Sequence, residues 1–151
     1  MKRILIYIAA LTAALLVPQR GTDIGKLQPV GVVQLYREGA SVVIVTDTGD
    51  SGTGKTVQEA FRNLEETTAG VIFLDTADYL LLSKSAVEEA PSLETYLKQS
   101  IRVCFAEAEI SPAEAAEYLP MHRPNIRLRE RKSLANAETL AQENGRLVLR
   151  Q

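Results

Sequence analysis

The sequence predicts a small α/β (α+β) domain in which helices pack on one face of a mixed β-sheet. Apolar runs bounded by turn residues are typical of strands, and the segments between them carry apolar residues at helical spacing. Hydrophobic residues make up 46% of the 151 residues, enough for the core of one domain. The expected order is β-β-α-β-α-β-α followed by a β-α-β tail, and an N-terminal hydrophobic helix precedes it.

The first element is a hydrophobic segment typical of a membrane-targeting signal. Lys2 and Arg3 precede an apolar run over residues 4–18, and Arg20 follows it. The run is shorter than the about 20 residues of a comfortable transmembrane helix. No small-x-small cleavage site follows it, nor any cysteine that could accept a lipid. Residues 1–20 are interpreted as a signal peptide or a signal anchor, and both alternatives stay open.

The basic residues before the run favour a cytoplasmic N-terminus, so residues 21–151 are expected outside the cytoplasm. We expect a polar linker over 21–28 and a single α/β domain over 29–151, with a core over 29–120 and a tail over 121–151. Without its first twenty residues the chain has 14 basic and 19 acidic residues. This acidic balance gives no reason to expect nucleic acid as a partner.

The domain begins with two expected strands and a helix. VGVVQLY (30–36) and SVVIVTD (41–47) are separated by REGA, which predicts a turn at Glu38-Gly39. The sequence TVQE (56–59) matches the S/T-x-x-E capping box at the start of a helix. The helix is expected to run to about Thr67-Thr68, and its apolar face comprises Val57, Ala60, Phe61 and Leu64.

The following elements alternate between strands and helices. VIFLDTADYLLL (71–82) predicts one strand, or two with a kink at Asp75–Asp78, and IRVCFAEAE (101–109) predicts another. Further capping boxes at 85–88 and 111–114 predict helices, the first continuing around Ser92–Lys98 and the second ending before Pro120. In the tail we expect an edge strand over 127–132, a helix near 134–143 that stops at Asn144-Gly145, and a final strand.

The stretch GDSGTGKT (49–56) matches the phosphate-binding pattern G-x-x-x-x-G-K-[ST] and resembles the loop of small GTPases. In that interpretation Gly49 and Gly54 shape the loop, Lys55 binds the terminal phosphates, and Thr56 binds magnesium. Asp75, at the end of an apolar run, is the candidate for the acidic residue that would help to hold the magnesium ion.

Other observations favour a glycine turn followed by a capped helix. Asp78 stands where the DTAG element of small GTPases has glycine, and no N-K-x-D sequence follows. Nineteen residues separate Thr56 from Asp75, which leaves no room for a switch strand. We therefore predict that the Thr56 hydroxyl accepts from the Glu59 N–H. It should lie more than about 7 Å from the Asp75 carboxylate, too far for a shared magnesium ion.

The remaining chemistry-bearing residues predict no catalytic or metal site, and neither a cofactor nor an enzymatic activity is expected. Cys104 lies in an apolar run, so it is expected to be buried and inert. His122 is the only histidine, so neither a metal site nor a Cys–His pair is expected. Four aspartates could gather at one end of the sheet and hold a cation, but solvated loop acids are commoner: Asp47, Asp50, Asp75 and Asp78.

Four segments together match a family pattern. The pattern comprises a G-x-T-hydrophobic-x-E-A helix start, a strand with an aromatic residue after a glycine, a short helix before a strand that begins with arginine, and a small-residue helix. The matching segments are GKTVQEAFRNL (54–64), AGVIFLDTADYLLL (69–82), SLETYLKQSIRVCFAEAE (92–109) and SPAEAAEYL (111–119). Over roughly residues 27–120 the chain resembles the N-terminal domain of the C subunit of GerA-type spore germinant receptors, as a distant or truncated relative.

This resemblance implies a non-catalytic, membrane-associated interaction module in spore formation or germination of a Firmicute. It places the protein, membrane-anchored or secreted, on the extracytoplasmic face of a Gram-positive cell or spore. The implied partners are envelope or membrane proteins, including components like those of germinant receptors, with membrane contact through residues 4–18. The resemblance supplies no catalytic residues, and a nucleotide-binding protein that uses residues 49–56 is the alternative.

Overall fold

The computed structural model describes residues 24–151, so the predicted signal segment and N-terminal helix lie outside the described residues. The strands are β1 (Leu27–Pro29), β2 (Val32–Glu38), β3 (Ser41–Thr46), β4 (Ser51–Gly54), β5 (Val71–Phe73), β6 (Tyr79–Leu82), β7 (Arg102–Ala106), β8 (Ile126–Arg127), β9 (Thr139–Glu143) and β10 (Arg146–Arg150). The α-helices are α2 (Val57–Thr67), α3 (Ala90–Leu93) and α4 (Pro112–Tyr118), and the 3₁₀ helices are η1 (Ile24–Lys26), η2 (Leu74–Thr76), η3 (Lys84–Glu89) and η4 (Arg131–Asn136).

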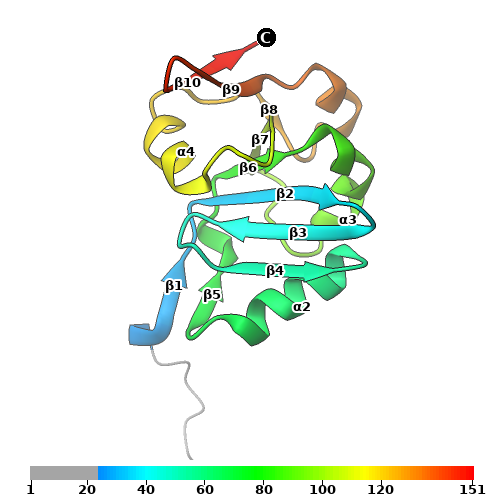
Figure 1. Cartoon of the computed structure of the whole chain (residues 1–151), viewed down its shortest axis with the longest axis vertical. Helices are drawn as coiled ribbons and strands as arrows, with labels where there is room; N and C mark the ends of the chain where they lie inside the picture. Colours follow the sequence, from blue (N-terminus) through cyan, green and yellow to red (C-terminus); the bar gives the residue numbers. More distant parts are fainter. Residues whose placement is uncertain (1–23) are drawn as a thin grey trace, which may run out of the picture.

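Most strands form one eight-stranded mixed sheet in the order β10-β9-β7-β6-β2-β3-β4, with β8 paired to β7 (Figure 1). Its centre is parallel, because β2, β6, β7 and β9 run in the same direction. Antiparallel pairs flank this centre, β2–β3–β4 on one side and β9–β10 on the other. The predicted mixed α/β architecture is thereby confirmed.

Helices cover both faces of the sheet, so the expectation of helices on one face is wrong. Leu35, Leu80 and Val103 belong to one buried cluster with residues of α2 and α3. Val32, Leu81 and Cys104 belong to a second cluster, with Ala115 and Leu119 from and beside α4. All four residues of β6, YLLL, are buried. A continuous apolar strand is typical of a parallel sheet covered on both faces, and this is the signal that the one-face interpretation overlooked.

A second, smaller sheet lies outside the main one. β1 pairs in parallel with β5, with Leu27 opposite Val71 and Pro29 opposite Phe73. β1 therefore begins within residues 21–28, the range for which the sequence predicts a linker. The apolar run 71–82 divides into β5 and β6 with η2 between them, as the two-strand alternative predicts.

The tail differs from the predicted β-α-β order, because residues 139–150 form a β-hairpin in place of the helix near 134–143. Asn144 and Gly145 both have positive φ, 50° and 75°, as the tight two-residue turn of a hairpin requires. The edge strand expected over 127–132 ends at Arg127. Arg131 lies in η4 instead, where its guanidinium pairs with Glu94 and lowers the pKa of that carboxyl.

The other predicted helices are shorter than expected or begin elsewhere. Ser85 lies inside η3, whose N-cap is Ser83, so the capping box at 85–88 is wrong. The helix expected around Ser92–Lys98 is not formed: α3 is a single turn that ends at Leu93, and Leu93 and Leu97 are buried. The start of α4 is confirmed at Pro112, but the side chain of Ser111 makes no capping hydrogen bond.

Candidate functional site

The stretch GDSGTGKT does not form a phosphate-binding loop, because its middle residues are strand β4. Gly49 lies in the turn after β3, where its N–H donates to the carbonyl of Thr46 (3.1 Å). Ser51 to Gly54 then pair with β3 in antiparallel register. Gly49 and the Lys55-Thr56 pair consequently lie at opposite ends of a strand, and backbone groups that a phosphate would need are engaged in the sheet.

The glycines of β4 permit close packing of α2, and the interpretation that Gly52 and Gly54 serve a turn is wrong. A Cβ atom at Gly52 would lie 2.2 Å from the carbonyl oxygen of Ala60. A Cβ atom at Gly54 would lie 2.6 Å from the amide nitrogen of the same residue. Both distances are far below van der Waals contact, so only glycine lets the helix backbone lie directly on the strand.

The predicted cap of α2 is confirmed. The Glu59 N–H donates to the Thr56 hydroxyl (3.2 Å), and the Glu59 carboxylate accepts from the Lys55 N–H (2.8 Å). The first contact satisfies a backbone donor that the first turn of a helix leaves free, and the second joins the Glu59 side chain to the residue before the N-cap, in place of the N-cap N–H of a standard capping box. The Lys55 side chain is exposed. The Thr56 hydroxyl is engaged in capping the helix.

Asp75 lies in η2, after the strand β5. Thr56 caps the first turn of α2, whereas β5 follows its last turn, and the eleven-residue helix between them is about 16 Å long. β5 pairs with β1 and does not return alongside α2 in the main sheet. The fold therefore does not bring Asp75 into the capping site of Thr56.

The other aspartates each have their own partners. The Asp47 carboxylate accepts from the Gly31 N–H (3.0 Å), Asp50 accepts from the Thr48 hydroxyl (2.8 Å), and Asp78 pairs with Lys98 (2.7 Å). Within residues 24–151 no three histidine, cysteine or acidic side chains gather in a way that could hold a metal ion.

Cys104 is buried in β7, as predicted. Burial, aided by the negative charge of Glu138, raises the pKa of its thiol to about 12, so the thiol stays protonated and a poor nucleophile near neutral pH. His122 is exposed, and its ring stacks on Tyr118 at 4.1 Å between centroids. Cys104 is enclosed in the core on the α4 side of the sheet, whereas the His122 ring is exposed and stacks on Tyr118, so the thiol and the imidazole do not form a catalytic pair.

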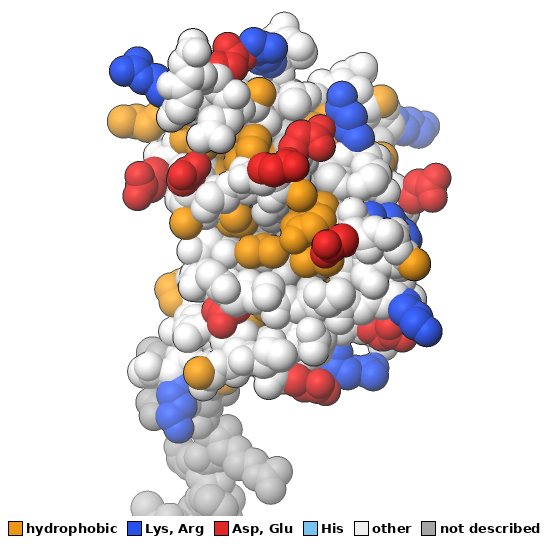
Figure 2. Space-filling view, in the orientation of Figure 1, with side chains coloured by type: hydrophobic (Ala, Val, Ile, Leu, Met, Phe, Trp, Pro, Cys, Tyr) orange, Lys and Arg blue, Asp and Glu red, His pale blue; other side chains and the backbone are white. Residues whose placement is uncertain are grey.

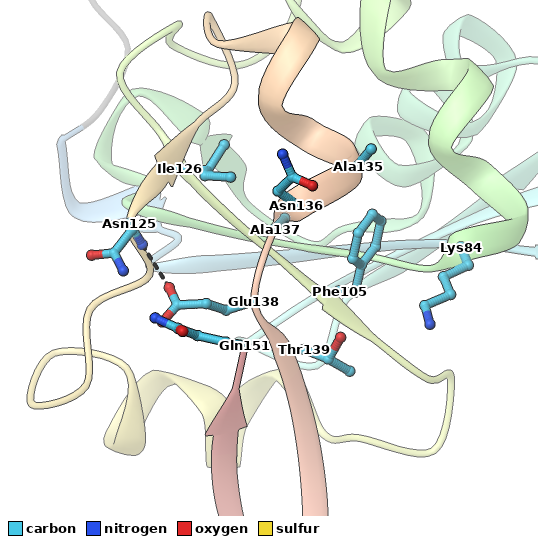
Figure 3. Close-up of a pocket in the computed structure, with 10 residues that line it drawn as sticks. All are labelled: Lys84, Phe105, Asn125, Ile126, Ala135, Asn136, Ala137, Glu138, Thr139 and Gln151. Carbon is cyan, nitrogen blue, oxygen red and sulfur yellow. Dashed lines mark hydrogen bonds between the residues drawn. The ribbon is translucent and has the colours of Figure 1, made fainter.

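A hollow of about 540 Å³ lies at the carboxyl ends of β6 and β7, the edge where parallel sheets commonly bind ligands (Figure 3). Phe105 forms its apolar floor, Lys84 lies on one side, and Glu138 lies on the other (Figure 3). The Glu138 carboxylate accepts from the Asn125 N–H (2.8 Å). The sequence analysis did not predict this hollow because its residues come from distant segments. The available signal was the carboxyl ends of the apolar strands, where parallel sheets commonly bind ligands.

The lining of the hollow offers polar groups that could hold a ligand. Its polar groups, those of Lys84, Asn136 and Thr139 among them, can donate or accept hydrogen bonds. Glu138 is the carboxylate side chain of the lining, and it is engaged with a backbone N–H.

The β1–β5 pair carries exposed apolar side chains. Val71 is 46% exposed and Phe73 is 39% exposed, and both belong to β5. Lys26, just before β1, is also exposed. Figure 2 shows hydrophobic and basic side chains at the lower end of the molecule, where Figure 1 places β1 and β5. This apolar ribbon (β1 and β5) lies where the described chain begins.

Comparison of the chain with protein-family models, with curated proteins and with solved structures finds no match in any of the three.

Proposed function

We propose that this protein is a non-catalytic interaction module that works at the outer face of a membrane. The observation that carries the proposal is the exposure of Val71 and Phe73 on the apolar ribbon. The first strand of the ribbon, β1, begins three residues after Ile24, which is the first described residue. The ribbon is therefore close in sequence to the hydrophobic run 4–18. Exposed apolar side chains next to a membrane-directed segment are suited to the interfacial region of a bilayer.

Chain length limits how far this ribbon can be from the bilayer. Six residue steps separate Pro18 from Ile24, and a fully extended chain covers at most about 20 Å over that length. If residues 4–18 are inserted, β1 and β5 stay close to the lipid headgroups. No helix among residues 24–151 is long and apolar enough to cross a membrane, so the proposed insertion rests on the N-terminal run.

The proposed partners are envelope or membrane proteins, including components like those of germinant receptors. This part of the proposal rests on the resemblance of residues 27–120 to the germinant-receptor C subunit, and it includes a role in spore formation or germination. Transcription timed to sporulation, measured beside that of neighbouring germination or spore-envelope genes, would support it. Transcription confined to vegetative growth would contradict it.

The orientation is tested with a reporter enzyme that is active only outside the cytoplasm, fused after Gln151. The proposal expects an active fusion. A matched fusion from which residues 1–20 are deleted should be inactive, because the signal is lost. An inactive full-length fusion that accumulates in the cytoplasm would overturn the proposal.

Membrane contact of the ribbon is tested with tryptophan, which the chain lacks. Phe73→Trp in the full-length protein, reconstituted into vesicles, should be quenched by brominated lipids. The control is Ala40→Trp, in the exposed turn that follows β2. The seven residues of β2 span about 23 Å, so this turn lies far from the end of β2 that is next to the ribbon. Equal quenching of both variants, or of neither, would contradict the contact.

A further inference from the structure

A small hollow of about 170 Å³ lies at the amino ends of β6 and β7, away from the hollow in Figure 3. All of its lining residues carry polar or charged groups: Asp78, Tyr79, Ser100, Arg102 and Arg123. At about 30 Å³ per water molecule, its volume is that of about six waters. The space is thus large enough for a carboxylate or phosphate group.

Two arginines of this hollow lack a carboxylate partner. Arg102 donates to the carbonyl of Pro124 (2.6 Å), and Arg123 donates to the carbonyl of Pro120 (3.3 Å). The ion pairs among residues 24–151 use other cations: Arg37, Lys98, Arg131 and Arg150. Each contact engages one N–H group of a guanidinium that has five, so donors remain for a ligand.

A third arginine increases the positive charge beside the hollow. Arg127 of β8 stands directly opposite Arg102 of β7 in antiparallel register, which puts both side chains on the same face of the sheet. Arg127 likewise forms no ion pair with a described residue. Like charges in opposed positions destabilise a strand pair, and a bound anion removes that repulsion.

The acid in the lining does not cancel this charge. The Asp78 carboxylate accepts a hydrogen bond from the Lys98 ammonium at 2.7 Å, so the two charges offset each other. Arg102 and Arg123 are left as the net charge of the lining, and Ser100 adds an exposed hydroxyl donor.

We propose that this hollow binds an anionic oxygen group, the carboxylate or phosphate of a small ligand. Arg102 and Arg123 supply the charged N–H donors, and Ser100 supplies a hydroxyl donor. Guanidinium groups bind the paired oxygens of such anions through charge-assisted hydrogen bonds. The site is independent of the membrane contact proposed for β5, and either can fail without the other.

The test uses the full-length protein, labelled with ¹⁵N, in a non-ionic detergent. Inorganic phosphate and acetate are titrated separately while sodium chloride keeps the ionic strength constant. Saturable shifts of the Ser100 and Arg102 amide signals are expected with at least one of the two. Phosphate alone, acetate alone or both would identify a phosphate, carboxylate or common oxyanion site, and saturation by neither overturns the proposal.

Charge variants establish which residues bind. Arg123→Gln should weaken binding about fivefold or more, because it removes a charged donor from an exposed side chain. Arg102→Gln is the companion variant, and Arg146→Gln on β10 removes the same charge elsewhere. Equal weakening by Arg146→Gln would show a general charge effect and overturn the assignment. No weakening by Arg123→Gln and Arg102→Gln would show that these arginines do not bind the anion and would also overturn it.

Discussion

The two edges of the main sheet are protected in different ways. At the β4 edge, the Asn63 side chain of α2 accepts from the Thr53 N–H (2.9 Å), and the Thr67 hydroxyl lies within 3.1 Å of the Ser51 carbonyl. At the β10 edge the hydroxyl of Tyr118, the last residue of α4, accepts from the Leu149 N–H (3.2 Å), and no second side-chain contact to a β10 backbone group is made by the described residues. The first edge is closed by a helix, and the second by one side chain.

The composition of each edge strand accounts for how that edge is protected. β4 is SGTG, and its glycines let a helix approach until side chains reach the free backbone groups. β10 is RLVLR, with bulky side chains and an exposed arginine at each end. Charged residues at an edge discourage pairing with another sheet without any covering element.

The largest expected effect is at Gly52. Gly52→Val should lower the free energy of unfolding by about 3 kcal/mol, because its side chain would enter the space of the Ala60 carbonyl and the Leu64 backbone. Gly49→Ala is the control, since its Cβ meets nothing within 4 Å and only the φ of 90° costs about 1–2 kcal/mol. Chemical denaturation measures both, and a smaller loss for Gly52→Val would contradict the packing role.

The stability of the sheet centre can be measured through the buried thiol of Cys104 and compared with that of the edges. Cys104 on β7 has a pKa of about 12 in the folded protein and an ordinary value of 9.0. Between those values the unfolded chain loses the thiol proton and the folded chain keeps it. Stability attributable to Cys104 is therefore complete below pH 9 and falls by about 1.4 kcal/mol per pH unit above it.

Denaturation of the wild type and of Cys104→Ala from pH 8 to 11 isolates this contribution from the titration of other groups. The wild type should lose stability more steeply. Parallel pH profiles would show that the thiol is not protected by burial. Thiol labelling of Cys104 also reports opening of the sheet centre, so it separates fraying of an edge from global unfolding.

Opening the β4 edge should have a smaller effect. Asn63→Ala should cost about 1 kcal/mol and accelerate hydrogen exchange of the Thr53 amide, because that N–H loses its acceptor. The rate of thiol labelling at Cys104 should change in this variant only as much as the loss of global stability requires. Gln58→Ala removes an amide from an exposed position on the same helix, and the same acceleration of Thr53 exchange in that variant would refute the edge contact.

The smallest effect is expected at the β10 edge. Tyr118→Phe removes the hydroxyl that accepts from Leu149, at a cost of about 0.5–1 kcal/mol, and should speed exchange of the Leu149 amide. Tyr36→Phe on β2 is the control, because the Tyr36 hydroxyl has no hydrogen-bond partner within the described chain. An unchanged Leu149 exchange rate would leave β10 protected by its arginines alone.

Local patterns were enough to predict the elements whose causes lie within a few residues. The α2 face of Val57, Ala60, Phe61 and Leu64 is buried as the helical spacing predicts, and Thr56 caps the helix. In the tail, the same kind of reasoning took Asn144-Gly145 as a helix stop. The pair also favours a hairpin turn, and the apolar residues on its two sides pair as β9 and β10.

The candidate phosphate loop shows what a local pattern cannot decide. The letters of GDSGTGKT are compatible with a loop around phosphate and with a strand under a helix. Pairing with β3, a segment outside the pattern, selects the strand. Likewise, the hollows at the two ends of β6 and β7 unite residues from segments far apart in the sequence.

The mixed α/β class, the buried strands and the cap of α2 follow from the amino-acid sequence alone, because periodicity and capping depend on neighbours along the chain. The tertiary structure is needed to show that helices cover both faces, that Gly52 and Gly54 face Ala60, and that Arg102 and Arg123 line one hollow. Those outcomes depend on which strands pair and on which side each crossover passes, and these are properties of contacts between distant segments.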